Sequence, residues 1–440
     1  MSTAELGLPV DVPSTALFTD RYELTMLQAA LRSGAAHRRS VFEAFTRRLP
    51  DGRRYGVVAG TGRVLDAIEN FRFDAPVLDF LRREQVVDDD TLEWLAGYRF
   101  TGDVWGYPEG EVYFPGSPIL RVEGSFAEAV VLETAVLSIL NHDSAIAAAA
   151  SRMAVAAGGR PLMEMGARRT HELAAVAASR AAYIGGFRTS SNLAAGFRYG
   201  IPTVGTSAHA FTLLHDTERD AFTAQVESLG RGTTLLVDTY DVAAAVRAAV
   251  EIAGPELGAV RIDSGDLLLL AHRVRQQLDD LGAKDTKIVV TSDLDEYAIA
   301  SLAAAPVDAY GVGTSLVTGS GHPTCSMVYK LVARASGDGG PLVPVAKKSL
   351  GGKTSVGGRK WAARRVDGDG VAAAEVVGSG PVPAELADRQ LLVPLVRGGD
   401  IVGREPLEAA RLRHIEARAS LPLSATQLSR GEPVLPTEMV

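Results

Sequence analysis

Residues 259–290 read AVRIDSGDLLLLAHRVRQQLDDLGAKDTKIVV. The apolar run at 259–262 has the Val/Ile content of a buried strand, and the polar turn DSGD follows it at 263–266. A helical pattern at 267–281 then leads to a second apolar run at 287–290. A strand, a helix and a second strand in this order predict two parallel strands joined by a crossover helix, which indicates an α/β fold.

The same alternation continues in both directions along the chain. Further candidate strands, each followed by polar residues or glycine, lie at 161–165, 182–185, 202–205, 234–237 and 307–312. Seven strand candidates in line favour an α/β barrel over an open, doubly wound sheet. In such a barrel the residues that follow the strands meet at one mouth, which is where active sites lie.

The regions on either side of this alternation differ from it. Residues 1–140 combine a helical pattern at 20–33, a strand at 40–45 and β-rich sequence punctuated by Gly and Pro, which predicts an N-terminal α+β domain. The barrel domain is expected at 141–340. Residues 341–440 begin Gly-rich and basic, and we expect a strand-rich C-terminal segment that packs back on the N-terminal domain.

The composition restricts the classes of protein that fit. The chain has 440 residues, a net charge of -8 and 46% hydrophobic residues, which argues against a general binder of nucleic acid or anionic membranes. One cysteine, Cys325, allows no intramolecular disulfide, so a reducing compartment is expected. The N-terminus lacks the order of a secretory signal, and charged residues interrupt the most apolar region, 126–157. We expect a soluble, cytoplasmic protein.

Polar residues follow the predicted strands at matching positions. They are Glu164 with Arg168 and Arg169, residues 188–192, Thr206 with His209, Asp238 with Asp241, residues 263–266, Ser292 with Asp293, and residues 311–314. Arginines and backbone N–H groups beside glycines bind phosphate, while carboxylates hold sugar hydroxyls or a magnesium ion. The predicted mouth therefore suits a phosphorylated sugar.

Each of these groups also has an ordinary structural explanation. Asp263 and Asp266 could cap the following helix, and a lone histidine such as His209 is most often a core or surface residue. Their shared position after apolar runs favours one common mouth. Residues 347–354 end in GKT but lack the first glycine of a phosphate loop, and the pair at 311 and 313 does not complete a dinucleotide fingerprint.

The chain resembles the nicotinate phosphoribosyltransferase family, whose members join nicotinate to 5-phosphoribosyl-1-diphosphate in NAD salvage. The resemblance runs nearly end to end. It is carried by TDRYELTM at 19–26, FEAF at 42–45, EMGARR at 164–169, GGF at 185–187, SSN at 190–192, GTSAH at 205–209, RIDSGD at 261–266 and GVGT at 311–314. Together these motifs are specific, although none would be so alone.

The resemblance implies a type II phosphoribosyltransferase architecture: an N-terminal α+β domain, completed by the C-terminal segment, and an irregular TIM-like α/β barrel. It also implies a homodimer with an active site shared between subunits, in which Tyr22 stacks on the pyridine ring, commonly from the neighbouring subunit. Thr206 and Arg261 are implied to contact nicotinate, and a guanidinium fork is the natural partner of its carboxylate.

For the second substrate, the resemblance implies that Thr314, beside Gly311 and Gly313, holds the ribose 5-phosphate. Arg169 is expected to reach the diphosphate or the substrate carboxylate. Asp263 is expected to bind the ribose hydroxyls or Mg²⁺. The pyridine nitrogen attacks the anomeric carbon as diphosphate leaves, so arginines and magnesium stabilise the growing negative charge and no side-chain base is needed.

His209 matches the histidine that ATP phosphorylates in this family, which implies a transferase coupled to ATP hydrolysis. A nicotinamide phosphoribosyltransferase remains the nearest alternative, because contacts such as Arg261 decide between carboxylate and amide. A quinolinate phosphoribosyltransferase, a non-catalytic barrel that binds phosphorylated metabolites and a phosphosugar aldolase or isomerase are further alternatives. The last would need a catalytic Lys or Glu aimed into the barrel.

Overall fold

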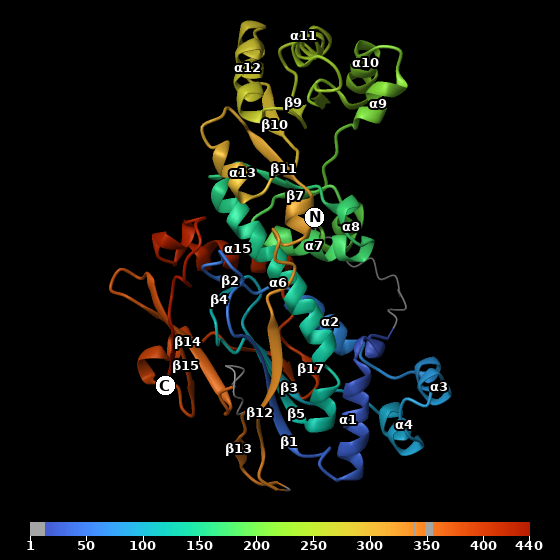
Figure 1. The fold of residues 1–440 in the computed structure, drawn as a ribbon, viewed down its shortest axis with the longest axis vertical. Helices are drawn as coiled ribbons and strands as arrows, with labels where there is room; N and C mark the ends of the chain where they lie inside the picture. The colour runs from blue at the N-terminus through green and yellow to red at the C-terminus, as the bar shows by residue number, and fades with distance from the viewer. Residues whose placement is uncertain (1–13, 338, 348–354) are drawn as a thin grey trace.

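The strand and helix alternation forms a parallel sheet in the computed structural model, which describes residues 14–337, 339–347 and 355–440 (Figure 1). The first 13 residues and the rejected phosphate-loop stretch at 348–354 lie outside the described residues. The sheet has six parallel strands in the order β7-β6-β11-β10-β9-β8. The strands are β6 (Leu162–Glu164), β7 (Thr189–Ser190), β8 (Thr234–Leu236), β9 (Ala259–Ile262), β10 (Lys287–Val290) and β11 (Ala309–Val312).

This sheet is a curled half-barrel. In the part of the chain that the structure describes, β7 and β8 are its two edges, and β7 has one further bridge, from Ser190 to Thr203. The prediction of a mixed α/β fold with parallel strands is confirmed. The predicted strand at 202–205 is reduced to that single bridge, and the described strands leave the ring open between β7 and β8.

The predicted strand at 182–185 is wrong, because these residues are the end of helix α7 (Glu172–Ile184) and the glycine after it. Helix α7 as a whole is rich in alanine, the strongest helix former. The helix is also buried on most of its surface, which hides the helical period of its apolar residues. The strand of this unit is the two-residue β7, too short for a hydrophobic pattern.

Helices follow the strands of the half-barrel. They are η2 (Ala167–Arg169), α8 (Leu193–Tyr199), α9 (His209–Leu214), α10 (Glu218–Leu229), α11 (Val242–Ala253), α12 (Leu267–Asp280), α13 (Glu296–Ser301) and α14 (Thr314–Val317). Aspartates start three of them, since the side chains of Asp241, Asp266 and Asp295 accept hydrogen bonds from backbone N–H groups in the first turns. Asp266 is therefore a helix cap, as its ordinary explanation proposed.

A seven-stranded antiparallel sheet occupies the other end of the molecule (Figure 1). Its order is β13 (Leu342–Pro344), β12 (Met327–Ala335), β1 (Arg39–Thr46), β5 (Leu120–Ser125), β3 (Asp103–Gly106), β16 (Val393–Arg397) and β17 (Asp400–Ile401). Around it lie η1 (Ala16–Phe18), α1 (Arg21–Arg32), α2 (Thr61–Glu69), α3 (Ala75–Arg83), α4 (Asp89–Ala96), α5 (Phe126–Val130), and the short pair β2 (Gly56–Val57) and β4 (Val112–Tyr113). N-terminal and C-terminal strands thus share one sheet.

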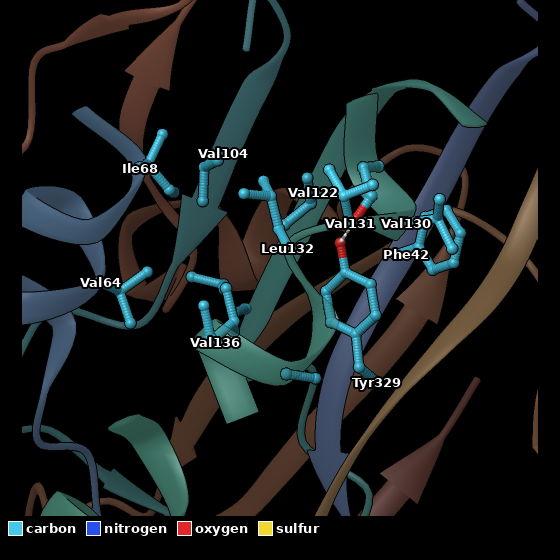
Figure 2. Packing of buried hydrophobic residues seen from close by; sticks show 14 of the residues in the cluster. Phe42, Val64, Ile68, Val104, Val122, Val130, Val131, Leu132, Val136 and Tyr329 are labelled. Carbon is cyan, nitrogen blue, oxygen red and sulfur yellow. Dashed lines mark hydrogen bonds between the residues drawn. The ribbon is translucent and has the colours of Figure 1, made fainter. Parts of the chain in front are cut away.

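The core behind this sheet is apolar and well packed (Figure 2). The rings of Phe42 and Tyr329 stack with centroids 4.9 Å apart, which ties β1 to β12. The Tyr329 hydroxyl donates a hydrogen bond to the Ala129 carbonyl at 2.9 Å, so this buried phenol has a partner. Side chains from α5 and the start of α6, such as Val130 and Val136, fill the space beside them.

Helix α6 (Glu133–Ala156) joins the two ends of the molecule, because it contacts α2 and β12 as well as α7 and α13. The helical stretch Phe126–Ala156 is long and apolar enough to cross a membrane by length and composition. However, 61% of its apolar window is buried inside the protein, as in the core helix of a soluble protein. No membrane protein is indicated.

The C-terminal part returns to the N-terminal strands. A three-stranded sheet of β14 (Lys360–Val366), β15 (Ala372–Ser379) and β18 (Thr437–Met439) is accompanied by η3 (Ala384–Arg389), α15 (Leu407–Ala419) and η4 (Leu423–Thr426). The Lys360 ammonium donates to the buried Glu43 carboxylate of β1 at 2.6 Å. The domain boundaries at 140 and 340 stay predictions, and α6 runs through the first of them.

Candidate functional site

A cleft with a volume of about 590 Å³ lies where the parallel strands end. Met165 follows β6, Asp263 follows β9, Thr291 follows β10 and Gly313 follows β11, and all four line it. Because the carboxyl ends of parallel strands meet at one edge of a sheet, residues far apart in the sequence converge here.

Seven of the nine predicted site residues line this cleft: Arg169, Thr206, Arg261, Asp263, Gly311, Gly313 and Thr314. Arg168, Ser292 and Asp293, also noted at strand ends, line it too. His209 directly follows the lining residues Ser207 and Ala208. Tyr22 lies apart from the cleft, on α1. The structure thus brings seven of the predicted substrate contacts together and leaves Tyr22 apart from them, while the individual roles stay predictions.

Arg261 projects from β9 and carries unused hydrogen-bonding capacity. Its Nη1 donates to the Thr206 hydroxyl, while its Nε is buried and has no hydrogen-bond partner among the described residues. Burial lowers the pKa of the Arg261 guanidinium, and the charge of Arg168 lowers it further, against the opposing effects of Asp263 and Asp238. A guanidinium that is partly desolvated and not fully hydrogen-bonded is suited to bind an incoming carboxylate.

Asp263 is held in place at the end of β9 rather than capping the next helix. Its carboxylate accepts a hydrogen bond from the Thr291 hydroxyl, and its backbone N–H donates to Asp238 Oδ2 at 2.9 Å. No described residue donates a hydrogen bond to the second carboxylate oxygen of Asp263, which is a cleft-lining residue. Such an oxygen can accept from a sugar hydroxyl or coordinate a cation.

His209 begins α9 and pairs with a buried carboxylate. Its Nε2 lies 3.1 Å from Asp238 Oδ1, with the imidazole 40% exposed and the Asp238 side chain only 2% exposed. Because a carboxylate accepts hydrogen bonds, this contact assigns a proton to Nε2, and in the neutral imidazole it leaves the lone pair on Nδ1. The other oxygen, Asp238 Oδ2, accepts from Ser264 Oγ at 2.7 Å as well as from the Asp263 N–H.

Asp238 is therefore a candidate functional residue to which the sequence analysis assigned no individual role. It links His209 to the Asp263 turn of the cleft. The signal was present, since Asp238 and His209 both follow predicted strands. The pairing could not be predicted, because the two residues are separated by 29 positions and face each other only after the strands have curled.

Gly311 and Gly313 line the cleft at the end of β11, and of the two only Gly311 is too closely packed to accept a side chain without a shift. A Cβ atom at Gly311 would approach the Thr291 side chain to 2.6 Å and the Met165 sulfur to 2.7 Å, which no real side chain does. At Gly313 the nearest atom would be the Met165 carbonyl oxygen at 3.5 Å, which is ordinary contact. The absent side chain at Gly311 is thus required by packing, and Thr314 follows at the start of α14.

Tyr22 lies on the surface of α1 and is 45% exposed. Burial raises the pKa of its phenol to about 12, together with the charge of Glu133, to which the phenol donates a hydrogen bond. Phe18 and Met26, four residues before and after Tyr22, are also exposed. This apolar strip, Phe18, Tyr22 and Met26, is available to a second molecule rather than to the cleft of its own chain.

Comparison with known proteins gives one consistent answer. The family models described as the nicotinate phosphoribosyltransferase N-terminal domain and the nicotinate phosphoribosyltransferase family match residues 17–141 and 161–346. A Mycobacterium tuberculosis nicotinate phosphoribosyltransferase is 58% identical over 99% of this chain and 97% of its own length. A Bacillus subtilis nicotinate phosphoribosyltransferase is 39% identical over 79% of this chain and 72% of its own.

Solved structures agree over nearly the whole chain. The crystal structure of human nicotinic acid phosphoribosyltransferase has a TM-score of 0.81 at 27% identity, covering 96% of this chain and 97% of that one. The crystal structure named nicotinate-nucleotide pyrophosphorylase from Pyrococcus furiosus has a TM-score of 0.75 at 26% identity, covering 95% and 99%.

Proposed function

This chain belongs to the nicotinate phosphoribosyltransferase family, and we propose that in NAD salvage it joins nicotinate to 5-phosphoribosyl-1-diphosphate in a reaction coupled to ATP hydrolysis. The observation that carries the proposal is Arg261, whose buried Nε has no partner among the described residues, in a cleft where strand ends converge. The expected products are nicotinate mononucleotide and diphosphate, with ADP and phosphate from ATP.

The cleft supplies a separate contact for each part of the two substrates. The nicotinate carboxylate binds Arg261 and Thr206, which orients the pyridine nitrogen. The ribose 5-phosphate binds at Thr314 beside the backbone of Gly311 and Gly313. Placing both substrates in one desolvated cleft replaces a bimolecular encounter by an oriented one, which is a large part of the expected rate enhancement.

The chemical step needs stabilisation of charge and no proton transfer. The pyridine nitrogen lone pair forms the bond to the anomeric carbon, and the bond to the diphosphate oxygen breaks with its electron pair leaving on diphosphate. Arg169 stabilises this negative charge, and the attacking nitrogen carries no proton that a base must remove.

Magnesium fits the residues present as a partner of the substrate rather than of a protein cage. Within the described ranges, no group of three or more His, Cys, Asp or Glu side chains is arranged to hold a metal ion. Mg²⁺ commonly binds one or two carboxylates together with substrate phosphates. Asp263 would be its protein ligand, and the ion would neutralise charge on the diphosphate leaving group.

ATP coupling acts through His209 in this proposal. Its free Nδ1 attacks the γ-phosphorus of ATP, the bond to the β,γ-bridging oxygen breaks and ADP leaves. The Asp238 carboxylate stabilises the imidazolium character that develops on the ring. Water later hydrolyses the phosphohistidine and releases phosphate. The phosphoryl group adds roughly two negative charges beside the Asp263 turn, which links it to the phosphoribosyl subsite.

Assays with three pyridines test the substrate. Purified protein should convert nicotinate, with nicotinamide and quinolinate tested in parallel, with and without ATP. Turnover of nicotinamide alone would contradict the proposal and favour a nicotinamide phosphoribosyltransferase. Binding of 5-phosphoribosyl-1-diphosphate without diphosphate release from any pyridine would favour a non-catalytic barrel.

Phosphorylation of His209 is tested separately. Mass spectrometry should detect phosphate on His209 after treatment with ATP. His209→Ala should keep part of the transferase activity and lose its stimulation by ATP. If that variant retained full ATP coupling, the role of His209 would be wrong.

The proposal also covers the oligomeric state of the protein and its location in the cell. We infer a cytoplasmic homodimer, with an irregular TIM-like barrel and an N-terminal α+β domain completed by the C-terminal segment. Two exposed apolar surfaces support pairing: the strip of Phe18, Tyr22 and Met26, and the α8 face with Leu193 and the 86% exposed Phe197. The α8 face directly follows the cleft residue Ser191, so a subunit bound there could bring Tyr22 to the cleft.

A further inference from the structure

Glu164, the last residue of β6, is a buried carboxylate under the wall of the cleft. Its exposed fraction is 1%, and it is not itself a lining residue. One carboxylate oxygen accepts the backbone N–H of Gly166. The other accepts the Ser190 hydroxyl and the Ser179 hydroxyl, the latter at 2.7 Å. Three donors from three different segments therefore converge on one side chain.

No positive charge accompanies this carboxylate. Among the ion pairs of the described ranges, none involves Glu164, and its three donors are all neutral. A buried charge without a counter-ion costs desolvation free energy, so an apolar residue of similar size would serve better if filling the space were the only requirement. What the carboxylate adds is the ability to fix several donors at once.

The donors belong to the segments that build the cleft. Gly166 opens the turn that carries Arg168 and Arg169. Ser190 precedes the lining residue Ser191, whose N–H donates to the Glu164 carbonyl at 2.8 Å. The Glu164 backbone and side chain thus hold both the arginine turn and the end of β7.

The arginine turn also packs against the segment 311–317, which contains Thr314, the predicted ligand of the ribose 5-phosphate. A Cβ atom at Gly166 would come within 2.3 Å of the Val317 side chain and 3.0 Å of the Gly313 carbonyl oxygen. A shift of the turn toward α14 would therefore press on Gly313 or Val317. The hydrogen bonds of Glu164 consequently set the spacing between the arginines and the loop that carries Thr314.

We propose that Glu164 is a positioning residue that fixes the turn 165–169, and through it Arg168 and Arg169, at the spacing required by the diphosphate of the substrate. The proposal rests on the proposed function for the identity of that substrate. It assigns Glu164 no contact with substrate and no proton transfer.

The test is Glu164→Gln, which keeps the shape but replaces one acceptor oxygen by an N–H₂ donor that faces hydroxyl groups. Glu375→Gln is the matched control, because Glu375 is equally buried and accepts from Tyr107, Ser117 and Arg364 away from the cleft. Both variants should lower the thermal unfolding temperature. Only Glu164→Gln should raise KM for 5-phosphoribosyl-1-diphosphate, by about tenfold or more, with a smaller change in kcat.

Calorimetry with inorganic diphosphate and Mg²⁺ gives a readout that does not depend on turnover. Wild type should bind diphosphate, and Glu164→Gln should bind it about tenfold more weakly. If wild type bound diphosphate but made no nicotinate mononucleotide, the proposed function would fail while the role of Glu164 could still be measured. Equal diphosphate affinity and equal KM in wild type and Glu164→Gln would overturn the positioning role.

Ser190→Ala provides the second variant in case Glu164→Gln does not fold. It removes one donor and leaves the charge in place, so we expect KM and the diphosphate dissociation constant to rise by a few-fold in the same direction. A Ser190→Ala enzyme with both constants unchanged, together with a misfolded Glu164→Gln, would also overturn the proposal.

Discussion

Arg261 is the cleft residue to which we assign the choice between a carboxylate and an amide substrate. Replacing it by Ala removes the charged donor group that the nicotinate carboxylate would bind. Hydrogen bonds to charged groups contribute about 1.5–3 kcal/mol, so KM for nicotinate should rise about 10- to 100-fold. The affinity for 5-phosphoribosyl-1-diphosphate, measured by calorimetry, should change much less.

Arg231→Gln is a suitable control for Arg261→Ala, because Arg231 is exposed and pairs only loosely with Glu256 at 3.6 Å. It should leave both constants at their wild-type values. An equal loss for both substrates in Arg261→Ala would mean that Arg261 supports the cleft as a whole and does not select the carboxylate.

Replacing Asp238 should impair both ATP stimulation and the binding of 5-phosphoribosyl-1-diphosphate, whereas replacing His209 should impair ATP stimulation alone. Asp238→Asn weakens the contact with His209 and also those with the Asp263 N–H and the Ser264 hydroxyl. We expect the loss of ATP stimulation seen in His209→Ala, together with an increase of at least about threefold in KM for 5-phosphoribosyl-1-diphosphate. Initial rates at varied substrate concentration, with and without ATP, measure both. A variant that lost ATP stimulation alone would show that the Asp263 contact is dispensable.

At this scale the sequence predicted which residues gather, but not every pair that they form. Thr206 and Thr314 stood at predicted strand ends, Arg261 was named from the family resemblance, and the structure places all three in one cleft. The Asp238 pairing and the three donors of Glu164 depend on how much each strand turns within the sheet. That curvature has no counterpart in a local sequence pattern.

Strands and helices could likewise be predicted from the sequence only where a local pattern marks them. Strands β8 to β11 were predicted within a few residues, because their Val/Ile runs are bounded by polar turns. The end of the alanine-rich helix α7 was mistaken for a strand, since a helix buried on most sides loses its amphipathic period. The pairing of β12 with β1 was not predicted, because it joins residues almost 300 positions apart.

Helix α15 should make stability depend on pH through His414. This imidazole is fully buried, with Nδ1 3.1 Å from the Gly110 carbonyl and Nε2 2.8 Å from the Ser151 hydroxyl. Burial lowers the pKa of His414 from 6.5 to about 3. Between these values the unfolded chain binds a proton that the folded chain does not, so the free energy of unfolding should fall as the pH drops below 6.5.

Denaturant unfolding at pH 7.5, 6 and 5, used here as approximate test points, measures this dependence. His414→Gln cannot titrate and should have a shallower decline than wild type, although it is less stable at neutral pH. His37→Gln, at an exposed histidine, should follow the wild-type curve. Parallel curves for wild type and His414→Gln would show that other groups cause the decline.

The whole molecule is expected to work as a pair. Tyr22→Ala and Arg261→Ala damage opposite sides of a shared site, so each variant alone should have low activity. Each mixed dimer would contain one intact site of two, so the purified mixed dimers should have about half of the wild-type activity. Co-expression with two affinity tags and a transferase assay of the doubly purified sample measure this recovery. No recovery in verified mixed dimers would contradict a site shared through Tyr22.

The pairing of β16 with β3 has a consequence for synthesis of the chain. Val104 lies opposite Val396, so 396 − 104 = 292 residues separate the two partners. At ~5–20 residues per second, a ribosome leaves that edge of β3 unpaired for roughly 15–60 s while it makes the half-barrel. An exposed strand edge attracts other strands. The nascent chain is therefore vulnerable to aggregation at β3, and chaperones that cover this edge until β16 emerges should raise the yield of folded protein.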